Sequence, residues 1–174
     1  MKVYIVRHGE TRNNSLKLYN SYEDDLNDTG IEQAKNLRDK ITSIDFDVIF
    51  SSTLIRTRHT TDIININNKE VIFDDRLKER NIGNFASKPL DTVNRDEYWN
   101  YNTSIQYGTS ENIKLFFNRV YSFLDDLKLK NYESVLIVAH SGVSKVFSAY
   151  FEGIGDGMFL KRGLKNCEIK EYEL

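Results

Sequence analysis

Short β-branched runs alternate along this chain with segments of helical periodicity, and this alternation limits the fold more than any other feature. The runs are Val3–Val6, Val48–Phe50, Val71–Phe73 and Val135–Ala139. Runs that are apolar at every position are typical of parallel strands that are buried on both faces, with helices between them. The pattern therefore predicts an α/β fold, with a mostly parallel central sheet between two layers of helices.

Two long helices are indicated by apolar residues at helical spacing. The apolar positions of the first are Ile31, Ala34, Leu37 and Ile41, and those of the second are Ile113, Phe116, Val120, Phe123 and Leu127. Thr29 with Glu32 predicts a capping box at the start of the first helix. Glu111 is expected in the first turn of the second, where it would favour the helix dipole. The alternating run Glu168–Tyr172 predicts an edge strand.

The chain of 174 residues is expected to form a single domain over residues 1–174, because its length suits one core and no repeat or flexible linker is visible. Residues 81–108 break the pattern, with Gly83, Pro89 and Gly108 and without clear periodicity. We expect them to form an irregular, lid-like segment that packs on the same domain.

Composition excludes several classes of function. The single cysteine, Cys167, cannot form an intramolecular disulfide, and the net charge of -2 argues against general nucleic-acid binding. The longest apolar stretch, Val135–Ala139, is too short to cross a membrane, and Val3–Val6 lacks the features of a signal peptide. We therefore expect a cytoplasmic monomer or homodimer with no nucleic-acid or membrane partner.

Cationic side chains follow three of the predicted strands. Arg7 and His8 come directly after the first run, Arg56 lies shortly after the second, and His140 directly follows Val135–Ala139. Because ligands of open α/β sheets bind at the carboxyl ends of the strands, we expect these side chains to converge there. They would repel one another unless an anion lay between them, and guanidinium groups match phosphoryl oxygens in geometry and charge. The sequence therefore predicts a site for a phosphoryl group.

The motif Arg7-His8-Gly9-Glu10-Thr11, with Asn14, resembles the signature of the histidine phosphatase superfamily, which includes the cofactor-dependent phosphoglycerate mutases. The resemblance covers nearly the whole chain and implies a phosphoglycerate mutase-like fold. Further segments that are similar to the family's pattern are Leu26 to Ala34, Ser52 to Thr60, Leu77 to Gly83, Gly108 to Arg119, Val135 to His140 and Asn166-Cys167. Some residues depart from the family's pattern, and these departures leave the substrate subclass open. They are Thr57, His59, Phe85 to Ser87, Ser141 and Lys145.

The resemblance implies a metal-independent phosphatase that needs no cofactor. His8 would attack phosphorus and become phosphohistidine, with a backbone carbonyl of the same loop holding its other ring nitrogen. Arg7, Arg56 and a protonated His140 would bind the phosphoryl oxygens. Glu79 would protonate the leaving oxygen and later activate the water that hydrolyses the intermediate.

The remaining candidate residues concern the substrate rather than the chemistry. Asn14 is expected to bind substrate, and Glu10 to order the loop or form the rim of the site. Glu111 and Arg119 are expected to support the entry of the second long helix. Residues that could line or flank a specificity pocket, although each could equally be ordinary surface or packing, are Tyr22, Arg12, His59, Lys88 and Trp99.

Three alternatives stay open at this point. In a phosphoglycerate mutase, His8 would return its phosphoryl group to a bound product, although residues Asn84 to Gly108 leave little chain for an enclosure over the site. A phosphate-binding regulatory protein would need neither His8 nor Glu79. A zinc hydrolase built on His8, Glu10 and His140 lacks a convincing further histidine ligand. We expect a phosphatase whose partner is a small phosphorylated metabolite.

Overall fold

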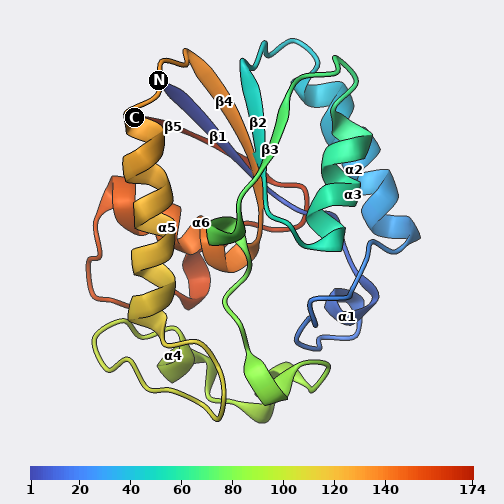
Figure 1. The fold of residues 1–174 in the computed structure, drawn as a ribbon. Helices are drawn as coiled ribbons and strands as arrows, with labels where there is room; N and C mark the ends of the chain where they lie inside the picture. The colour runs from blue at the N-terminus through green and yellow to red at the C-terminus, as the bar shows by residue number, and fades with distance from the viewer.

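Five strands form one sheet in the order β3-β2-β4-β1-β5 (Figure 1). The computed structural model describes residues 1–174. The strands are β1 (Lys2–Arg7), β2 (Val48–Ser51), β3 (Val71–Phe73), β4 (Ser134–Ala139) and β5 (Ile169–Glu173). Strands β1 to β4 are parallel, and β5 runs antiparallel along β1 at the edge. The predicted strands, including the edge strand, are confirmed, as is the mostly parallel sheet.

Helices cover both faces of this sheet (Figure 1). One layer holds α2 (Asp28–Ile41) and α3 (Ile55–Ile64), and the other holds α5 (Ile113–Lys128) and α6 (Ser141–Glu152). The side chains of β1 alternate between the two layers. Val3 and Ile5 belong to the core cluster that contains the apolar residues of α5 and α6, whereas Tyr4 and Val6 belong to the cluster that contains those of α2. The structure therefore has the three layers that the sequence predicts.

Both predicted long helices are present, but each begins differently from the prediction. The first turn of α2 is capped by Asn27, whose side chain accepts a hydrogen bond from the N–H of Gly30 at 2.8 Å. Thr29 already lies inside the helix, so the predicted capping box with Glu32 is wrong. A capping residue needs an extended backbone, and Asn27 has it with φ -89° and ψ 176°.

The buried stripe of α5 is confirmed, because every one of its five predicted positions is buried. The helix is capped by Asn112, which places Glu111 before the first turn rather than in it. Glu111 instead forms an ion pair with Arg119, in which Nε lies 2.7 Å from Oε1. Arg119 also donates to the carbonyl oxygens of Arg76 and Lys78 at 2.7 and 2.8 Å. The pair therefore ties α5 to the chain that leads to Glu79.

Residues 81–108 contain two short 3₁₀ turns, Gly83–Phe85 and Leu90–Thr92, and the single-turn helix α4 (Arg95–Tyr98). The segment lies near the carboxyl ends of the strands, as does the short helix α1 (Arg12–Ser15) (Figure 1). It is anchored by Tyr98 and Trp99, which are buried in the same core cluster as α5. None of the helices has both the length and the apolar character needed to cross a membrane.

Candidate active site

His8 and His140 lie side by side because two neighbouring strands end in register. Arg7 at the end of β1 pairs with Ala139 at the end of β4, so each histidine is the first residue beyond its strand. The N–H of His8 donates to the carbonyl of Ala139 at 3.0 Å, and the two imidazole rings meet edge to face with centroids 5.2 Å apart. The predicted convergence of the two histidines is therefore present in the structure.

The buried ring of His8 has one defined hydrogen-bond partner. Its Nδ1 lies 2.7 Å from the carbonyl oxygen of Gly9. Because a carbonyl can only accept, Nδ1 carries the hydrogen and Nε2 keeps its lone pair. Burial, followed by the charges of Arg56 and Arg7, holds the pKa of His8 well below its ordinary value of 6.5. The imidazole is therefore neutral at pH 7 and has the tautomer that a nucleophile at Nε2 requires.

The loop that carries His8 is fixed by close backbone contact with α2. A Cβ on Gly9 would lie 2.4 Å from the carbonyl oxygen of Gly30, and a Cβ on Gly30 would lie 2.1 Å from that of Glu10. Side chains larger than hydrogen are excluded at both positions. Asn27 adds a second link, because its Nδ2 donates to Glu10 Oε1 at 2.9 Å. The start of α2 therefore positions the nucleophile.

His140 is fully buried and is held by Ser52, whose Oγ lies 2.9 Å from Nε2. Its Nδ1 has no hydrogen-bond partner in the protein. Burial is the main reason why the pKa of His140 is well below 6.5, and the charges of Arg56, His8 and Arg7 act in the same direction. The ring is therefore neutral in this arrangement, and the protonated state that is expected beside a phosphoryl group stays a prediction.

Arg7 and Arg56 each have a buried nitrogen that lacks a hydrogen-bond acceptor in the protein. Arg7 donates from Nη1 to the carbonyl of Leu164 at 3.0 Å, and Arg56 from Nη1 to that of Ser21 at 2.8 Å. The Nε of each lacks a partner, and no carboxylate lies within ion-pair distance of either guanidinium. Burial lowers the pKa of Arg56 to about 10 and also lowers that of Arg7. Both groups remain cationic at pH 7, so an anionic ligand is favoured beside them.

Glu79 is held at the N-terminus of α6. Its Oε2 accepts from the N–H of Gly142 at 3.0 Å, and its Oε1 accepts from the N–H of Arg80 at 2.8 Å. A Cβ on Gly142 would lie 2.0 Å from Oε1 and 2.8 Å from the ring of Trp99, so the absence of a side chain there makes room for the carboxylate. The carboxylate is thus fixed in the lining of the cavity described next.

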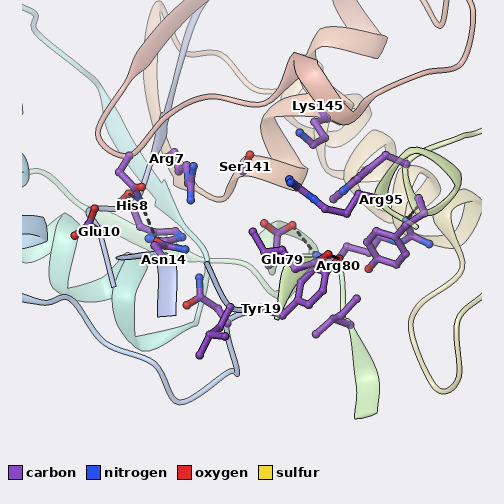
Figure 2. Close-up of a pocket in the computed structure, with 17 residues that line it drawn as sticks. Arg7, His8, Glu10, Asn14, Tyr19, Glu79, Arg80, Arg95, Ser141 and Lys145 are labelled. Carbon is purple, nitrogen blue, oxygen red and sulfur yellow. Dashed lines mark hydrogen bonds between the residues drawn. The ribbon is translucent and has the colours of Figure 1, made fainter. Parts of the chain in front are cut away.

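A cavity of about 340 Å³ joins the predicted residues of the site. Figure 2 shows Arg7, His8 and Asn14 on one side, Glu79 near the centre, and Arg80, Arg95 and Lys145 on the other side. Arg56 and His140 are not among the lining residues. Arg56 borders the neighbouring cavity, which Glu79 and Arg80 also line, and His140 packs behind His8. The structure therefore brings the five predicted catalytic residues together. Arg7, His8 and Glu79 line the cavity, whereas Arg56 and His140 lie next to it.

Asn14 lines the cavity but is also part of the loop structure. Its Oδ1 accepts from the N–H of Thr11 at 3.3 Å and from Asn166 Nδ2 at 3.2 Å, while Asn166 also donates to the carbonyl of His8 at 3.0 Å. The bond from Thr11 N–H to Asn14 and the reciprocal bond from Asn14 N–H to the Thr11 side chain form a capping box. A direct contact between Asn14 and substrate stays a prediction.

Of the candidates for a specificity pocket, Trp99 lines the main cavity. Tyr22 lines the neighbouring cavity but not the main one, and Arg12 and Lys88 line neither. His59 lies outside both and forms a pair with Asp25, with Nδ1 3.0 Å from Oδ1. Nowhere does the structure gather three or more potential metal-ligating side chains into one group.

Three cationic residues that line the cavity, Arg80, Arg95 and Lys145, were not among the predicted site residues. A signal existed for Lys145, which lies four residues after Ser141 and therefore on the same face of α6. Arg80 follows Glu79 directly, but its direction depends on packing against Tyr98. Arg95 belongs to a four-residue helix without periodicity, so nothing in the sequence pointed to it.

Comparison with known proteins agrees with this geometry. The family model of the histidine phosphatase superfamily (branch 1) matches residues 3–174. Phosphoserine phosphatase 1 of Hydrogenobacter thermophilus is 27% identical over 96% of this chain and 83% of its own length. A protein from Erwinia tasmaniensis that is named as a phosphoglycerate mutase is 27% identical over 99% of this chain and 85% of its own.

The crystal structure of the α-ribazole phosphatase from Shigella flexneri superposes with a TM-score of 0.85 at 25% identity, covering 100% of this chain and 91% of that one. The family match spans almost every residue, and it includes the strand ends that carry His8 and His140. The chain belongs to the histidine phosphatase superfamily.

Proposed function

We propose that this protein is a phosphatase that hydrolyses a small phosphomonoester through a phosphohistidine on His8, without a metal ion or cofactor. One observation carries the proposal. Around the neutral ring of His8, each of the three predicted phosphate ligands has a buried nitrogen without a protein partner, namely Arg7 Nε, Arg56 Nε and His140 Nδ1. Buried polar atoms are rarely left unpaired, so three in one site indicate a ligand with several acceptor oxygens.

The first chemical step follows from this arrangement. Nε2 of His8 attacks phosphorus, the bond from phosphorus to the leaving oxygen breaks, and Glu79 supplies the proton that the leaving oxygen needs. Arg7 and Arg56 oppose the negative charge on the phosphoryl oxygens during transfer. A phosphoryl dianion beside His140 would raise the pKa of that ring, so we expect protonation of His140 to accompany substrate binding.

The second step returns the enzyme to its initial state. Water attacks the phosphorus of phosphohistidine, the bond between phosphorus and Nε2 breaks, and Glu79 accepts the proton that the water loses. Inorganic phosphate leaves, and His8 is again neutral with its Nδ1–H on Gly9. The names of the relatives, two of which are phosphatases of small phosphorylated compounds, support hydrolysis as the overall reaction.

The test is the substitution His8→Ala, assayed with p-nitrophenyl phosphate and with acid-labile phosphoenzyme trapping. Loss of the nucleophile is expected to leave less than about a hundredth of the wild-type kcat and no trapped phosphoenzyme. His59→Ala is the matched control, because His59 lies outside the cavity, and it should keep both signals. A His8→Ala variant with near-normal turnover would contradict the proposal. An inactive wild type that still binds phosphate would favour the regulatory alternative.

Mutase action is the second candidate, because one of the relatives carries that name. The enzyme would be given 3-phosphoglycerate with catalytic 2,3-bisphosphoglycerate, and 2-phosphoglycerate and inorganic phosphate would both be followed. A mutase must shield phosphohistidine from water until it is transferred back. Residues Asn84 to Gly108 provide only short turns and the single-turn helix α4 for such a cover, so we expect phosphate to be released faster than isomer appears.

A further inference from the structure

Three cations line the cavity beyond Glu79 and have no role in the chemistry described so far. These distal cations are Arg80, directly after Glu79, Arg95 on α4 and Lys145 on α6. In Figure 2 they lie across Glu79 from Arg7 and His8. They come from three separate elements, and their convergence is therefore a product of the fold and not of a local run of charge.

The distal cations lack acidic partners. None of them takes part in any ion pair of the structure. Lys145 Nζ donates to the carbonyl of Leu160 at 2.8 Å, and Arg80 Nε donates to that of Glu111 at 2.9 Å. Carbonyl oxygens satisfy donors but carry no net charge. The two acids of the cavity, Glu10 and Glu79, form no ion pair with the distal cations, and the charge of Glu79, which acts on both Arg80 and Lys145, is a single negative charge facing three cations.

Burial makes this lack of partners significant. Arg80 is 3% exposed and Lys145 is 4% exposed, and the Nη2 of Arg80 has no hydrogen-bond partner at all. Aromatic rings support both cations, with the guanidinium of Arg80 3.6 Å from the centroid of Tyr98 and Lys145 Nζ 5.0 Å from that of Trp99. A buried cation normally requires an anion, since ring contacts offset only part of the lost hydration.

The anion in question is distinct from the phosphoryl group that is transferred. That group is accounted for by Arg7 and His140, which lie beside His8, and by Arg56, whose charge acts on both histidines. Because Glu79 protonates the leaving oxygen, whatever is attached to that oxygen extends past Glu79, toward the distal cations. The second anion therefore belongs to the alcohol part of the substrate.

We propose, on the basis of the proposed function, that the substrate is a small phosphomonoester whose alcohol part carries a second anionic group, either a carboxylate or another phosphate, and that the distal cations bind this group. The fork of an arginine matches either anion. The cavity of about 340 Å³ lies near the lower end of the roughly 300–1,000 Å³ common for ligand sites, so few carbon atoms can separate the two anions.

Matched substrates test the proposal. 3-Phosphoglycerate and glycerol 3-phosphate differ mainly in a carboxylate that is replaced by a hydroxymethyl group. Fructose 1,6-bisphosphate and fructose 6-phosphate provide the corresponding comparison for a second phosphate. Release of inorganic phosphate is measured for all four compounds. In one of the two pairs, we expect kcat/KM to be at least about tenfold higher for the member that carries the second anionic group. The pair that shows this preference identifies the second group as a carboxylate or a phosphate.

Variants show whether the distal cations cause the preference. Lys145→Met and Arg95→Gln should each reduce kcat/KM for the preferred substrate about tenfold or more, mainly through KM, and reduce it much less for its matched neutral partner. Arg95 is exposed on α4, so its substitution should leave folding intact even where that of the buried Lys145 does not. Lys40→Met is the control, because Lys40 is exposed on α2, does not line the cavity and forms no ion pair.

The outcomes separate this inference from the proposed function. If p-nitrophenyl phosphate is hydrolysed but both members of each pair react equally well, the proposal of a site for a second anion is wrong, whereas the proposed phosphatase function still holds. A preference that survives unchanged in Arg95→Gln and Lys145→Met also overturns the assignment to the distal cations. If neither p-nitrophenyl phosphate nor any member of the pairs is hydrolysed, the proposed function fails, and this inference fails with it.

Discussion

Glu79 owes its position to two backbone N–H groups and to the missing side chain of Gly142. The consequence is testable with Gly142→Ala, in which the new methyl group would displace the carboxylate. If Glu79 is the proton donor, alkyl phosphates should lose about tenfold or more of kcat, while p-nitrophenyl phosphate, whose leaving group needs no proton, should lose much less. Kinetics on both substrates, with a thermal melt to verify folding, would measure this.

Glu79→Gln provides the comparison for that variant, because it keeps the shape of the side chain and removes the acid. The same selective loss on alkyl phosphates is expected. Equal losses on alkyl and aryl substrates in both variants would show that Glu79 positions the substrate but transfers no proton.

The place of a residue in the site was predictable where the residue adjoins a clear strand, and it was not predictable where its position depends on tertiary packing. Arg7, His8 and His140 adjoin clear strands, so their convergence follows from topology. The N–H of Gly142 that binds Glu79 and the place of Arg95 depend on how α6 and α4 pack at the carboxyl edge, a long-range arrangement that no local pattern encodes. The neutral state of His140 was not predictable either, because it results from burial beside other cations.

Elements with strong periodicity were predictable as a whole, but their first residues were not. The stripe of α5 and the four parallel strands follow from apolar spacing alone. The start of α2 is set instead by the path of the chain before it, where Gly9 and Gly30 bring two backbones together. That contact leaves Asn27 extended and in place to cap, whereas Thr29, which has the more familiar capping-box sequence, is already helical.

The cap gives a direct test at this scale. Asn27→Ala removes the acceptor of Gly30 N–H and the donor to Glu10, so we expect it to lower the free energy of unfolding by about 1 kcal/mol. Thr29→Ala is the matched control, because Thr29 is exposed and caps nothing, and it should change stability by less than about 0.5 kcal/mol. Urea unfolding measures both. Equal effects of the two substitutions would contradict the assignment of Asn27 as the cap.

For the whole molecule, the sheet type was predictable but the strand order was not. Apolar runs indicate that strands are buried, but they do not indicate which strands are neighbours in the sheet. The order β3-β2-β4-β1-β5 places β1 and β4 together, although more than a hundred residues of chain separate them. That pairing creates the site, because it sets the two histidines edge to face in the buried interior. Burial of two histidines in this way makes the free energy of unfolding depend on pH.

His8 and His140 are held neutral in the folded protein, with pKa values well below 6.5, chiefly by burial. In the unfolded chain both would take up protons as the pH falls below about 6.5. The unfolded state then binds more protons than the folded state, so stability falls as the pH falls. The loss is about 1.4 kcal/mol per pH unit for each histidine, between pH 6.5 and the lower folded pKa.

This pH dependence can be measured by urea unfolding at pH 7, 6 and 5 in buffers without phosphate. We expect His8→Asn to lose about half of the slope between pH 6.5 and 5, because one of the two buried neutral histidines is removed. His59→Asn should keep the full slope, since His59 is partly exposed on α3. Carboxylates such as Asp47 and Asp75, whose pKa values are lowered by hydrogen bonds, change stability with the same sign but only below about pH 4. A slope that is identical in the wild type and in His8→Asn would show that His8 is already protonated in the folded protein, and the neutral nucleophile would then have to be abandoned.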